Sequence, residues 1–239
     1  VASGVSQYML TGVSTCLSGT TCAGTAQESK TTIAYGSQTA GIPNNLLPSS
    51  VTRSSGDNAV TATIASTYDS VGNVLTNDGP LPGSADTTRF RYDVARQRIG
   101  VVGPDPDGGG PRLPLAQRIT YNADGQVTQT EIGSVSDQSD SAWSAFTSLQ
   151  QATTTYDGNA RAIKSQIIAG GATYSVTQQS YDSSGRPRCQ VVRMDPAQWG
   201  AQSDACTPQT TGPNGPDRVV QTGYDALCRV TTVTAGVGT

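Results

Sequence analysis

The sequence contains no histidine, which removes the commonest general base and metal ligand from this chain of 239 residues. Catalytic arrangements of the Ser-His-Asp or Cys-His type therefore do not occur within it. An enzyme made from these residues would have to rely on carboxylates or lysine. We expect a chain that is not an enzyme and that holds no cofactor and no metal.

Clustered positive charge and long apolar runs are also missing. The chain has 15 basic and 18 acidic residues and a formal net charge of −3. Binding to phosphates requires clustered Lys and Arg, so nucleic acid is not expected as a partner. No apolar run reaches the ~18 residues of a membrane span, and no signal-peptide pattern is visible. Because the chain begins with Val1 and not Met, we expect a mature product or a piece of a longer polypeptide.

The residues that are abundant favour short strands joined by turns. There are 27 Gly and 13 Pro, Ser and Thr are frequent, and only 14% of the residues are charged. Thr and Val favour pleated structure, whereas Gly and Pro interrupt it. This composition predicts an all-β protein.

One hexapeptide, Tyr181-Asp182-Ser183-Ser184-Gly185-Arg186, recurs in imperfect copies. The spacing of the copies varies, and the variation falls after the second strand-like segment of each, which is typical of a repeat architecture with insertions. The conserved positions of the six copies are Tyr68, Asp69 and Gly72; Tyr92 and Asp93; Tyr121, Asn122 and Gly125; Tyr156 and Asp157; Tyr181, Asp182 and Gly185; and Tyr224 and Asp225.

Each copy lies between two strand-like segments and predicts a β-hairpin. The Asp or Asn is expected to accept a backbone N–H two residues on, and the Gly to supply a positive φ. The Tyr ring is expected to stack on its equivalent in the next hairpin. Arg96, Ala160 and Cys228 take the place of the turn Gly, so three turns must use another conformation or accept strain.

A single hairpin is marginally stable in water, so recurring hairpins should lie side by side in a twisted, coiling ribbon in which each repeat contacts its neighbours. We predict an array of six hairpins over 58–239, after an irregular or degenerate-repeat segment over 1–57. The predicted strands are 58–69, 73–78, 86–93, 97–103, 115–122, 126–132, 151–157, 161–168, 173–182, 186–193, 217–225 and 229–235.

Residues 1–57 carry no clear copy of the hexapeptide. A short strand is expected around Val5, Tyr8 and Leu10. The pair Tyr35-Gly36 follows a strand-like segment at 30–34 and resembles a degenerate copy.

Two insertions are expected to contain short helices. Residues 139–150 open with N-cap residues and place Trp143, Phe146 and Gln150 at helical spacing. Asp195-Pro196 before Trp199 predicts a single helical turn. Both tryptophans are read as apolar anchors of their insertions, although exposed rings would suit sugar stacking. The Gly- and Pro-rich segment 103–111 is expected to be an exposed connector.

The five cysteines allow two local disulfides, and those would indicate an oxidising compartment. The candidate pairs are Cys16 with Cys22 and Cys189 with Cys206. The alternative is a set of reduced thiols, since the spacing fits no zinc site. Cys228 is left over; burial as a small apolar residue is favoured over an intermolecular bond or a reactive thiol.

The recurring aspartates suggest a second hypothesis, in which stacked carboxylates bind calcium between hairpins. Each lies where a turn favours Asp, however, and Asn122 replaces one of them without a matching change nearby. The turn role is favoured. Asp105 and Asp107 faintly resemble a calcium loop, but no bidentate Glu follows, so a linker is favoured.

These hexapeptides resemble the YD repeats of the Rhs family of large bacterial surface and secreted proteins, which teneurins and toxin-complex C components share. The resemblance covers roughly 58–235. It implies a β-ribbon that spirals into a hollow shell around a toxin or other cargo, or that displays an adhesive surface. No self-cleavage segment and no toxin domain are recognisable, and six hairpins would form only part of a shell turn.

We therefore expect a structural segment of a secreted or surface shell. Its expected partners are flanking repeats of a longer parent chain, other copies of itself through strand edges, and an enclosed toxin. The alternative is an adhesin-like module that binds glycan or a partner protein through the loops at 79–86, 103–114 and 200–216, with Trp143 and Trp199 as stacking platforms. Glycan cleavage by carboxylates would need two of them to converge in one cleft.

Overall fold

The computed structural model describes residues 8–37, 46–209 and 211–236, and within them the fold is almost entirely β. Fifteen strands are hydrogen-bonded in chain order, with one short α-helix and one 3-10 turn in these residues. Neighbouring strands are antiparallel from β1 to β7 and from β9 to β15. The all-β ribbon of consecutive hairpins is therefore confirmed. The chain forms two compact units.

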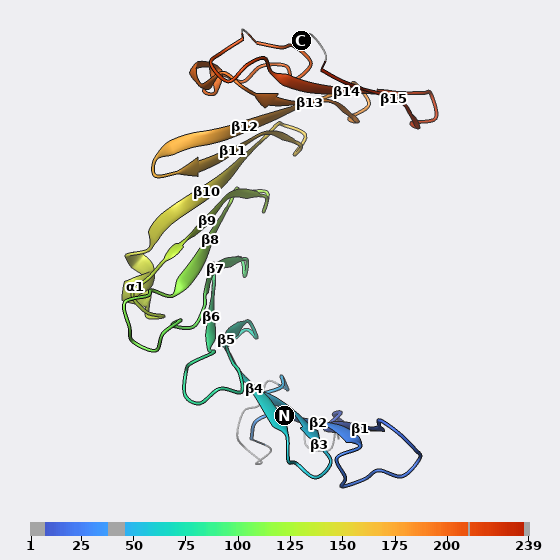
Figure 1. Ribbon diagram of the computed structural model, residues 1–239, viewed down its shortest axis with the longest axis vertical. Coiled ribbons are helices and arrows are strands. Elements are labelled where there is room, and N and C mark those ends of the chain that lie inside the picture. The colour runs from blue at the N-terminus through green and yellow to red at the C-terminus, as the bar shows by residue number, and fades with distance from the viewer. Residues whose placement is uncertain (1–7, 38–45, 210, 237–239) are drawn as a thin grey trace. The chain divides into compact units, whose positions relative to one another are not determined.

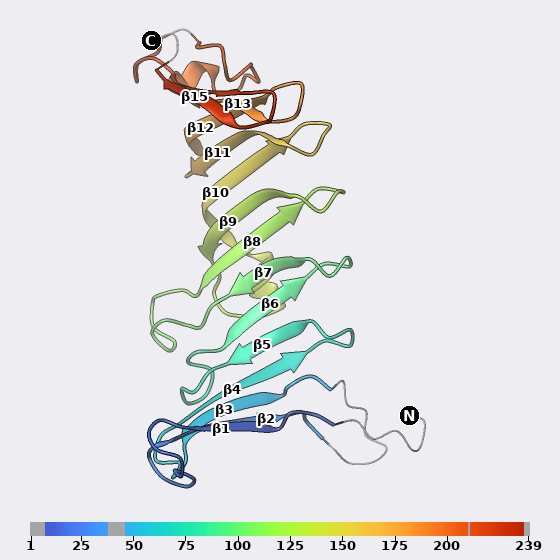
Figure 2. The ribbon, with the colours of Figure 1, turned by 90° about the vertical axis from the view of Figure 1, so that its right-hand side faces the viewer.

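The first unit comprises Val1–Ala116 and Val135–Ala145. Its helix belongs to an insertion, and the tight turns of its last two hairpins point to the same side (Figures 1 and 2). Its elements are β1 (Gly12–Cys16), β2 (Glu28–Ala34), β3 (Ser50–Ser55), β4 (Thr61–Tyr68), β5 (Val74–Asp78), β6 (Thr88–Tyr92), β7 (Arg98–Val102) and α1 (Asp140–Ser144).

The second unit comprises Gln117–Ser134 and Phe146–Thr239. Strands β10 to β13 lie side by side, and the insertion after β13 folds against them (Figure 1). Its elements are β8 (Leu115–Tyr121), which begins in the first unit, β9 (Val127–Ser134), β10 (Thr147–Tyr156), β11 (Ala162–Ala169), β12 (Ala172–Tyr181), β13 (Pro187–Arg193), the 3-10 turn η1 (Pro196–Gln198), β14 (Arg218–Tyr224) and β15 (Val230–Ala235).

The repeat tyrosines lie at a register shift just before each tight turn. In the β12–β13 hairpin, Ser180 pairs with Cys189 whereas Tyr181 pairs with Pro187, so one residue of β13 is left over. The same shift occurs at Tyr68, Tyr92, Tyr156 and Tyr224. A bulge of this kind bends the strand and increases its twist, so these five hairpins add the same local distortion.

The expected strands of the six hairpins are present, with bounds that differ by a few residues, but the N-terminal expectation was wrong in part. The chain forms no strand at Tyr8 or Leu10, since β1 begins at Gly12, and Val5 lies outside the described residues. The segment 1–57 also contributes three paired strands, because β1, β2 and β3 form continuous ladders. The strand expected at 30–34 lies within β2.

The helix expected over 139–150 is shorter than its sequence pattern predicts. Ser139 caps it, accepting from the N–H of Ala142 at 3.1 Å, but the helix ends at Ser144. From Thr147 the chain pairs with β9, so Gln150 lies in a strand and Phe146 precedes it. Pairing with a neighbouring strand overrides the helical spacing of these residues. The single turn expected after Asp195 is present as η1.

Buried apolar side chains gather where an insertion covers the sheet. In the second unit, Val191, Val219 and Cys189 are buried with Ala205 of the insertion. In the first unit, a Cβ added at Gly100 would lie 2.5 Å from the Trp143 ring, so α1 packs directly on β7. The hydrophobic contribution to stability is therefore concentrated in these two covered patches.

Candidate functional site

Each hexapeptide closes a tight turn that its own Asp or Asn holds together. Oδ1 of Asp182 accepts from the backbone N–H groups of Ser184 and Arg186, both at 2.9 Å, and Oδ2 accepts from Nε of Arg186 at 2.7 Å. The N–H of Gly185 donates to the carbonyl of Asp182 at 2.9 Å. The carboxylate thus satisfies turn N–H groups, as the turn interpretation predicts.

The other turns repeat this arrangement. The capping residues and the residues whose N–H groups they accept are Asp69 with Val71 and Asn73, Asp93 with Gln97, Asn122 with Asp124 and Gln126, Asp157 with Asn159 and Arg161, and Asp225 with Leu227 and Arg229. In the loop at 103–114, Asp105 likewise accepts from the N–H groups of Asp107, Gly108 and Gly109. No group of three or more Cys, Asp or Glu suited to a metal occurs in the described part of the chain.

These hydrogen bonds lower the pKa values of Asp69, Asp157, Asp182 and Asp225. The backbone N–H of Arg186 is the main cause of the lowered pKa of Asp182, and the side chain of Arg161 is the main cause for Asp157. A carboxyl whose pKa falls on folding stabilises the fold above its unfolded pKa of about 3.9. That contribution is lost as the pH falls through the folded value.

The variant Asp182→Asn is expected to lose this pH-dependent contribution. Asn still caps the turn, as Asn122 does, but it forms no ion pair with Arg186. At pH 6 we expect the wild type to have the higher free energy of unfolding in urea titrations, and at pH 3 we expect the difference to shrink. An equal difference at both pH values would contradict the assignment.

The three turns without Gly keep the same backbone conformation as the others. Arg96, Ala160 and Cys228 have φ values of 66°, 63° and 62°, whereas Gly185 has 80°. Of the two outcomes left open by the sequence, these turns therefore accept strain. The left-handed conformation costs a residue with a side chain about 1–2 kcal/mol.

Replacing Ala160 by Gly is expected to raise the free energy of unfolding by about 0.5–1 kcal/mol. Relief of the positive φ outweighs the extra entropy that Gly gives the unfolded chain. Gly185→Ala is the matched control and should destabilise by a similar amount, because its added Cβ would meet only Arg161 Nη1, at an ordinary 3.6 Å. Urea midpoints of both variants test this; a destabilising Ala160→Gly would contradict it.

Successive hairpins are joined by a recurring contact that we call the turn junction. It consists of the Tyr hydroxyl of one hairpin and the first residue of the second strand of the hairpin before it. Tyr181 Oη donates to the carbonyl of Ala162 at 2.9 Å, and Tyr224 Oη donates to that of Pro187 at 2.8 Å. An equivalent bond joins Tyr156 to Val127, the first residue of β9. The hydroxyls of Tyr68 and Tyr35 make similar bonds to the carbonyls of Pro48 and Leu10, which lie two residues before β3 and β1 begin.

The ring partner recorded at these junctions is an arginine. The guanidinium of Arg161 lies 4.4 Å from the centroid of Tyr181, and that of Arg186 lies 4.6 Å from that of Tyr224. The guanidinium covers one face of each ring at these two junctions, and the expected stacking of each Tyr on its equivalent stays a prediction. A guanidinium over the face of an aromatic ring is attracted by the negative charge of that face.

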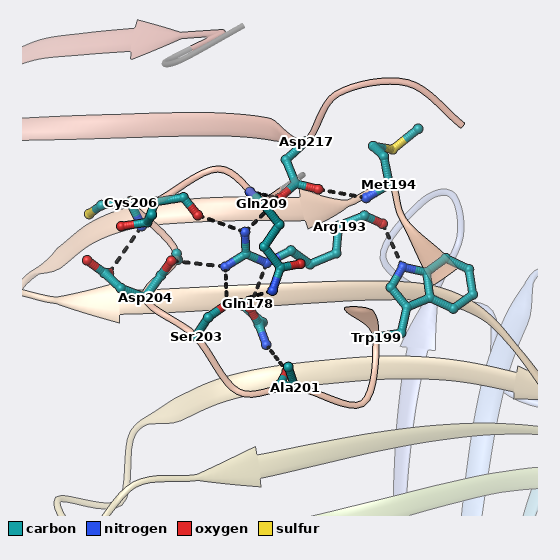
Figure 3. Close-up of polar contacts among 12 residues, drawn as sticks. Gln178, Arg193, Met194, Trp199, Ala201, Ser203, Asp204, Cys206, Gln209 and Asp217 are labelled. Atoms are coloured by element: carbon teal, nitrogen blue, oxygen red, sulfur yellow. Dashed lines mark hydrogen bonds and ion pairs between the residues drawn. The ribbon is translucent and has the colours of Figure 1, made fainter. Parts of the chain in front are cut away.

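The insertion between β13 and β14 is fixed by a buried polar cluster around Arg193 (Figure 3). The side chains of Arg193 and Asp217 are 0% and 1% exposed, and Arg193 Nη1 lies 2.7 Å from Asp217 Oδ2. All five guanidinium N–H groups have acceptors. The other acceptors are Gln178 Oε1 at 2.7 Å, Ser203 Oγ at 2.7 Å and the carbonyl oxygens of Thr207 and Asp204, each at 2.9 Å.

Asp217 is held as a carboxylate in this cluster. Burial raises its pKa, but the N–H groups of Gln209 and Met194, both at 2.9 Å, and the Arg193 guanidinium outweigh that effect, so the pKa is lowered. A buried ion pair with every donor satisfied gives a defined geometry to the segments that it joins. Here it ties the insertion to β12 and β13.

Four of the five cysteines form two disulfides, and the fifth is a free thiol. Cys16 is bonded to Cys22, and Cys189 is bonded to Cys206, so the second bridge holds the insertion to β13 close to the Arg193 cluster. The expected burial of Cys228 was wrong, since its side chain is exposed. It occupies a turn position, and the tips of these turns project from the ladder.

Both tryptophans pack as anchors of their insertions. Trp143 is half-buried on β7, with the guanidinium of Arg91 4.9 Å from its ring centroid. Trp199 is half-buried, and its Nε1 donates to the carbonyl of Arg193 at 2.9 Å (Figure 3). Neither ring is a freely exposed platform.

The Arg193 cluster was not found by sequence reasoning. Arg193 follows Cys189 and Val191 on the buried face of β13, at a strand end where Arg usually meets solvent. Its partner Asp217 lies at the far end of the insertion. The available signal was that opposite charges flank the segment 194–216. The arginines at 161 and 186 were visible in the hexapeptide, but their contact with the next Tyr was not.

No family model matches the sequence, and no curated protein matches it. Among solved structures, the chain is similar to crystal structures of TcdB2-TccC3. For TcdB2-TccC3-Cdc42 the TM-score is 0.39 and the identity 18%, over 88% of this chain and 11% of that chain. For TcdB2-TccC3 without its hypervariable C-terminal region the values are 0.39 and 18%, over 88% and 10%. The chain spans about a tenth of the length of these structures.

Proposed function

We propose that the chain is a structural YD-repeat segment of a large secreted or surface protein of Rhs type, where it forms part of a β-shell around cargo. The observation that carries this proposal is the turn junction. The same hydrogen bond from a Tyr hydroxyl couples one hairpin to the next within each unit, as at Tyr68 and Tyr181. In a repeat protein each repeat contacts mainly its neighbours, so a shell built from hairpins needs such a contact between each hairpin and the next.

The polar side chains of the repeats that could take part in chemistry are held in these turn and junction contacts. Carboxylates such as Asp157 and Asp182 accept from turn N–H groups and from an arginine, and the Tyr hydroxyls donate to backbone carbonyls. These contacts support a structural role for the hexapeptides. We therefore propose that the segment acts by its architecture and not by catalysis.

The two disulfides support a place outside the cytosol. Disulfides persist in oxidising compartments and are rare among cytosolic proteins. One bridge encloses the loop after β1 and the other fixes the large insertion, so both hold segments that lack strand pairing. No helix in the described residues is long and apolar enough to cross a membrane.

The adhesin alternative gains no specific support from the loops. Of the two tryptophans that would stack on sugars, Trp143 packs against β7. Trp199 donates to the backbone carbonyl of Arg193. The loop at 200–216 supplies ligands to the Arg193 guanidinium through Ser203 and Thr207. These contacts favour an insertion that covers the sheet over one that binds a ligand.

The proposal is tested by electron cryo-microscopy of the complete protein that contains this sequence. We expect further Tyr-Asp hairpins that continue the ribbon and enclose a cavity, together with an enclosed segment that resists added protease. A complete protein in which this ribbon stands alone, with both sheet faces open to solvent, would overturn the proposal.

A further inference from the structure

We infer that the outer edge of β15, together with Arg229 and Val230, is a docking site for an antiparallel β-strand that ends in Tyr-Asp. This inference deepens the proposed function and rests on it. It follows from the repetition of the turn junction inside the second unit, and it assigns each group at that edge a definite partner atom.

Two earlier hairpins show what the second strand of a hairpin binds on its outer edge. β11 pairs with β12, which ends in Tyr181, and β13 pairs with β14, which ends in Tyr224. In both cases the arginine before the second strand covers the Tyr ring, and the first carbonyl of that strand accepts from the Tyr hydroxyl. Arg186 also donates to the carbonyl of Asp225 at 3.2 Å, next to that Tyr.

The last hairpin has the same groups in the same places. Arg229 donates to Asp225 at 2.8 Å, as Arg161 and Arg186 donate to their own turn aspartates, and Val230 begins the second strand. The Arg229 side chain is 73% exposed, however, against 29% for Arg161 and 27% for Arg186. Its charged fork is oriented by Asp225, but its face is open to solvent.

The edge itself has the composition of a paired strand. All six residues of β15 are exposed, and among the described residues it pairs with β14 alone. Exposed edges of natural sheets usually carry Lys, Pro or another feature that discourages pairing. β15 has the sequence VTTVTA, which contains neither a charge nor a proline and has a high β-propensity.

The groups at this edge select a Tyr-Asp strand over a second copy of β15. Two β15 strands could pair antiparallel, but neither would present a Tyr ring to Arg229 or a hydroxyl to the Val230 carbonyl. A strand that ends in Tyr-Asp supplies the ring, the hydroxyl and the backbone carbonyl that the earlier junctions use. Main-chain pairing gives affinity in such strand addition, and the side-chain contacts give specificity.

The test uses the whole chain and a labelled peptide of residues 172–193 that carries Cys189→Ser, which supplies Tyr181 and Asp182. Fluorescence anisotropy should show saturable binding, and hydrogen exchange should show slower exchange in Val230–Ala235. The peptide variant Tyr181→Phe and the chain variant Arg229→Ala should each weaken binding by about fivefold, the equivalent of one hydrogen bond or cation–π contact. The chain variant Arg188→Ala, which removes an exposed arginine from β13, should leave the affinity for the peptide unchanged.

Several outcomes would overturn the inference. They are the absence of binding, binding that Tyr181→Phe and Arg229→Ala leave unchanged, and sedimentation of the chain as a dimer whose formation protects β15. The circular dichroism spectrum of Arg229→Ala at the assay temperature should match that of the wild type, which shows that the variant is folded. If peptide binding fails while the complete protein still forms a shell of hairpins, only this inference is lost.

Discussion

Replacing Arg193 by alanine is expected to lower the free energy of unfolding by about 3–5 kcal/mol. The change leaves Asp217 as a buried carboxylate without its counter-charge, and breaking one side of a buried ion pair carries a cost of this size. It also removes the donor to Gln178 and to the insertion. Since small domains have a total stability of about 5–15 kcal/mol, this is the most damaging single change that we predict.

The matched control is Arg188→Ala in the same strand. Its side chain is exposed, so we expect a change within about 0.5 kcal/mol. Urea unfolding followed by circular dichroism measures both variants. Equal effects of the two substitutions would show that the Arg193 cluster does not stabilise the second unit.

The double variant Arg193→Met with Asp217→Leu separates charge from packing. Removing both charges avoids the uncompensated carboxylate, so we expect the double variant to be more stable than Arg193→Ala. Recovery should be partial, because Gln178 and Ser203 lose their partner. If the double variant is less stable than Arg193→Ala, the ion pair itself stabilises the fold, beyond preventing an unpaired buried charge.

The second large effect is expected from removal of the Cys189–Cys206 disulfide. The two cysteines are 17 residues apart, and closing a loop of that size corresponds to about 3 kcal/mol. The variant with both cysteines changed to Ala should lose this amount. The insertion should also become accessible to protease, because the bridge and the Arg193 cluster hold the same segment.

The other disulfide provides the comparison. Cys16 and Cys22 are 6 residues apart, so loop closure predicts a smaller loss of about 2 kcal/mol. Both double variants can be compared by urea unfolding and by limited proteolysis at equal protein concentration. A larger loss from the Cys16–Cys22 pair would contradict the loop-closure account.

The hairpins follow from signals that are local in the sequence. Tyr181, Asp182 and Gly185 are local signals: the Asp caps N–H groups within its own turn, and the positive φ depends on a single residue. Because these interactions are complete within a few residues, reading them needs no knowledge of distant contacts. The strands on either side and the sequential sheet then follow, since each hairpin needs a neighbour.

The contacts between side chains of different repeats depend on how the strands pair in the folded chain. The helical spacing of Trp143, Phe146 and Gln150 indicates one helix, but pairing with β9 begins at Thr147 and turns the last two of these residues out of it. Ladder hydrogen bonds over several residues outweigh helix propensities that differ by a few tenths of a kcal/mol.

The Arg193 cluster and the turn junctions belong to the same class. Arg193 contacts Asp217, 24 residues away in the sequence, because the fold of the insertion brings them together. Arg186 contacts the ring of Tyr224 because of the register of the ladder. Their energies depend on burial and exact approach, which are properties of the assembled sheet. Local chemistry therefore set the repeat, while the contacts between repeats and the fixed insertion arose only from packing.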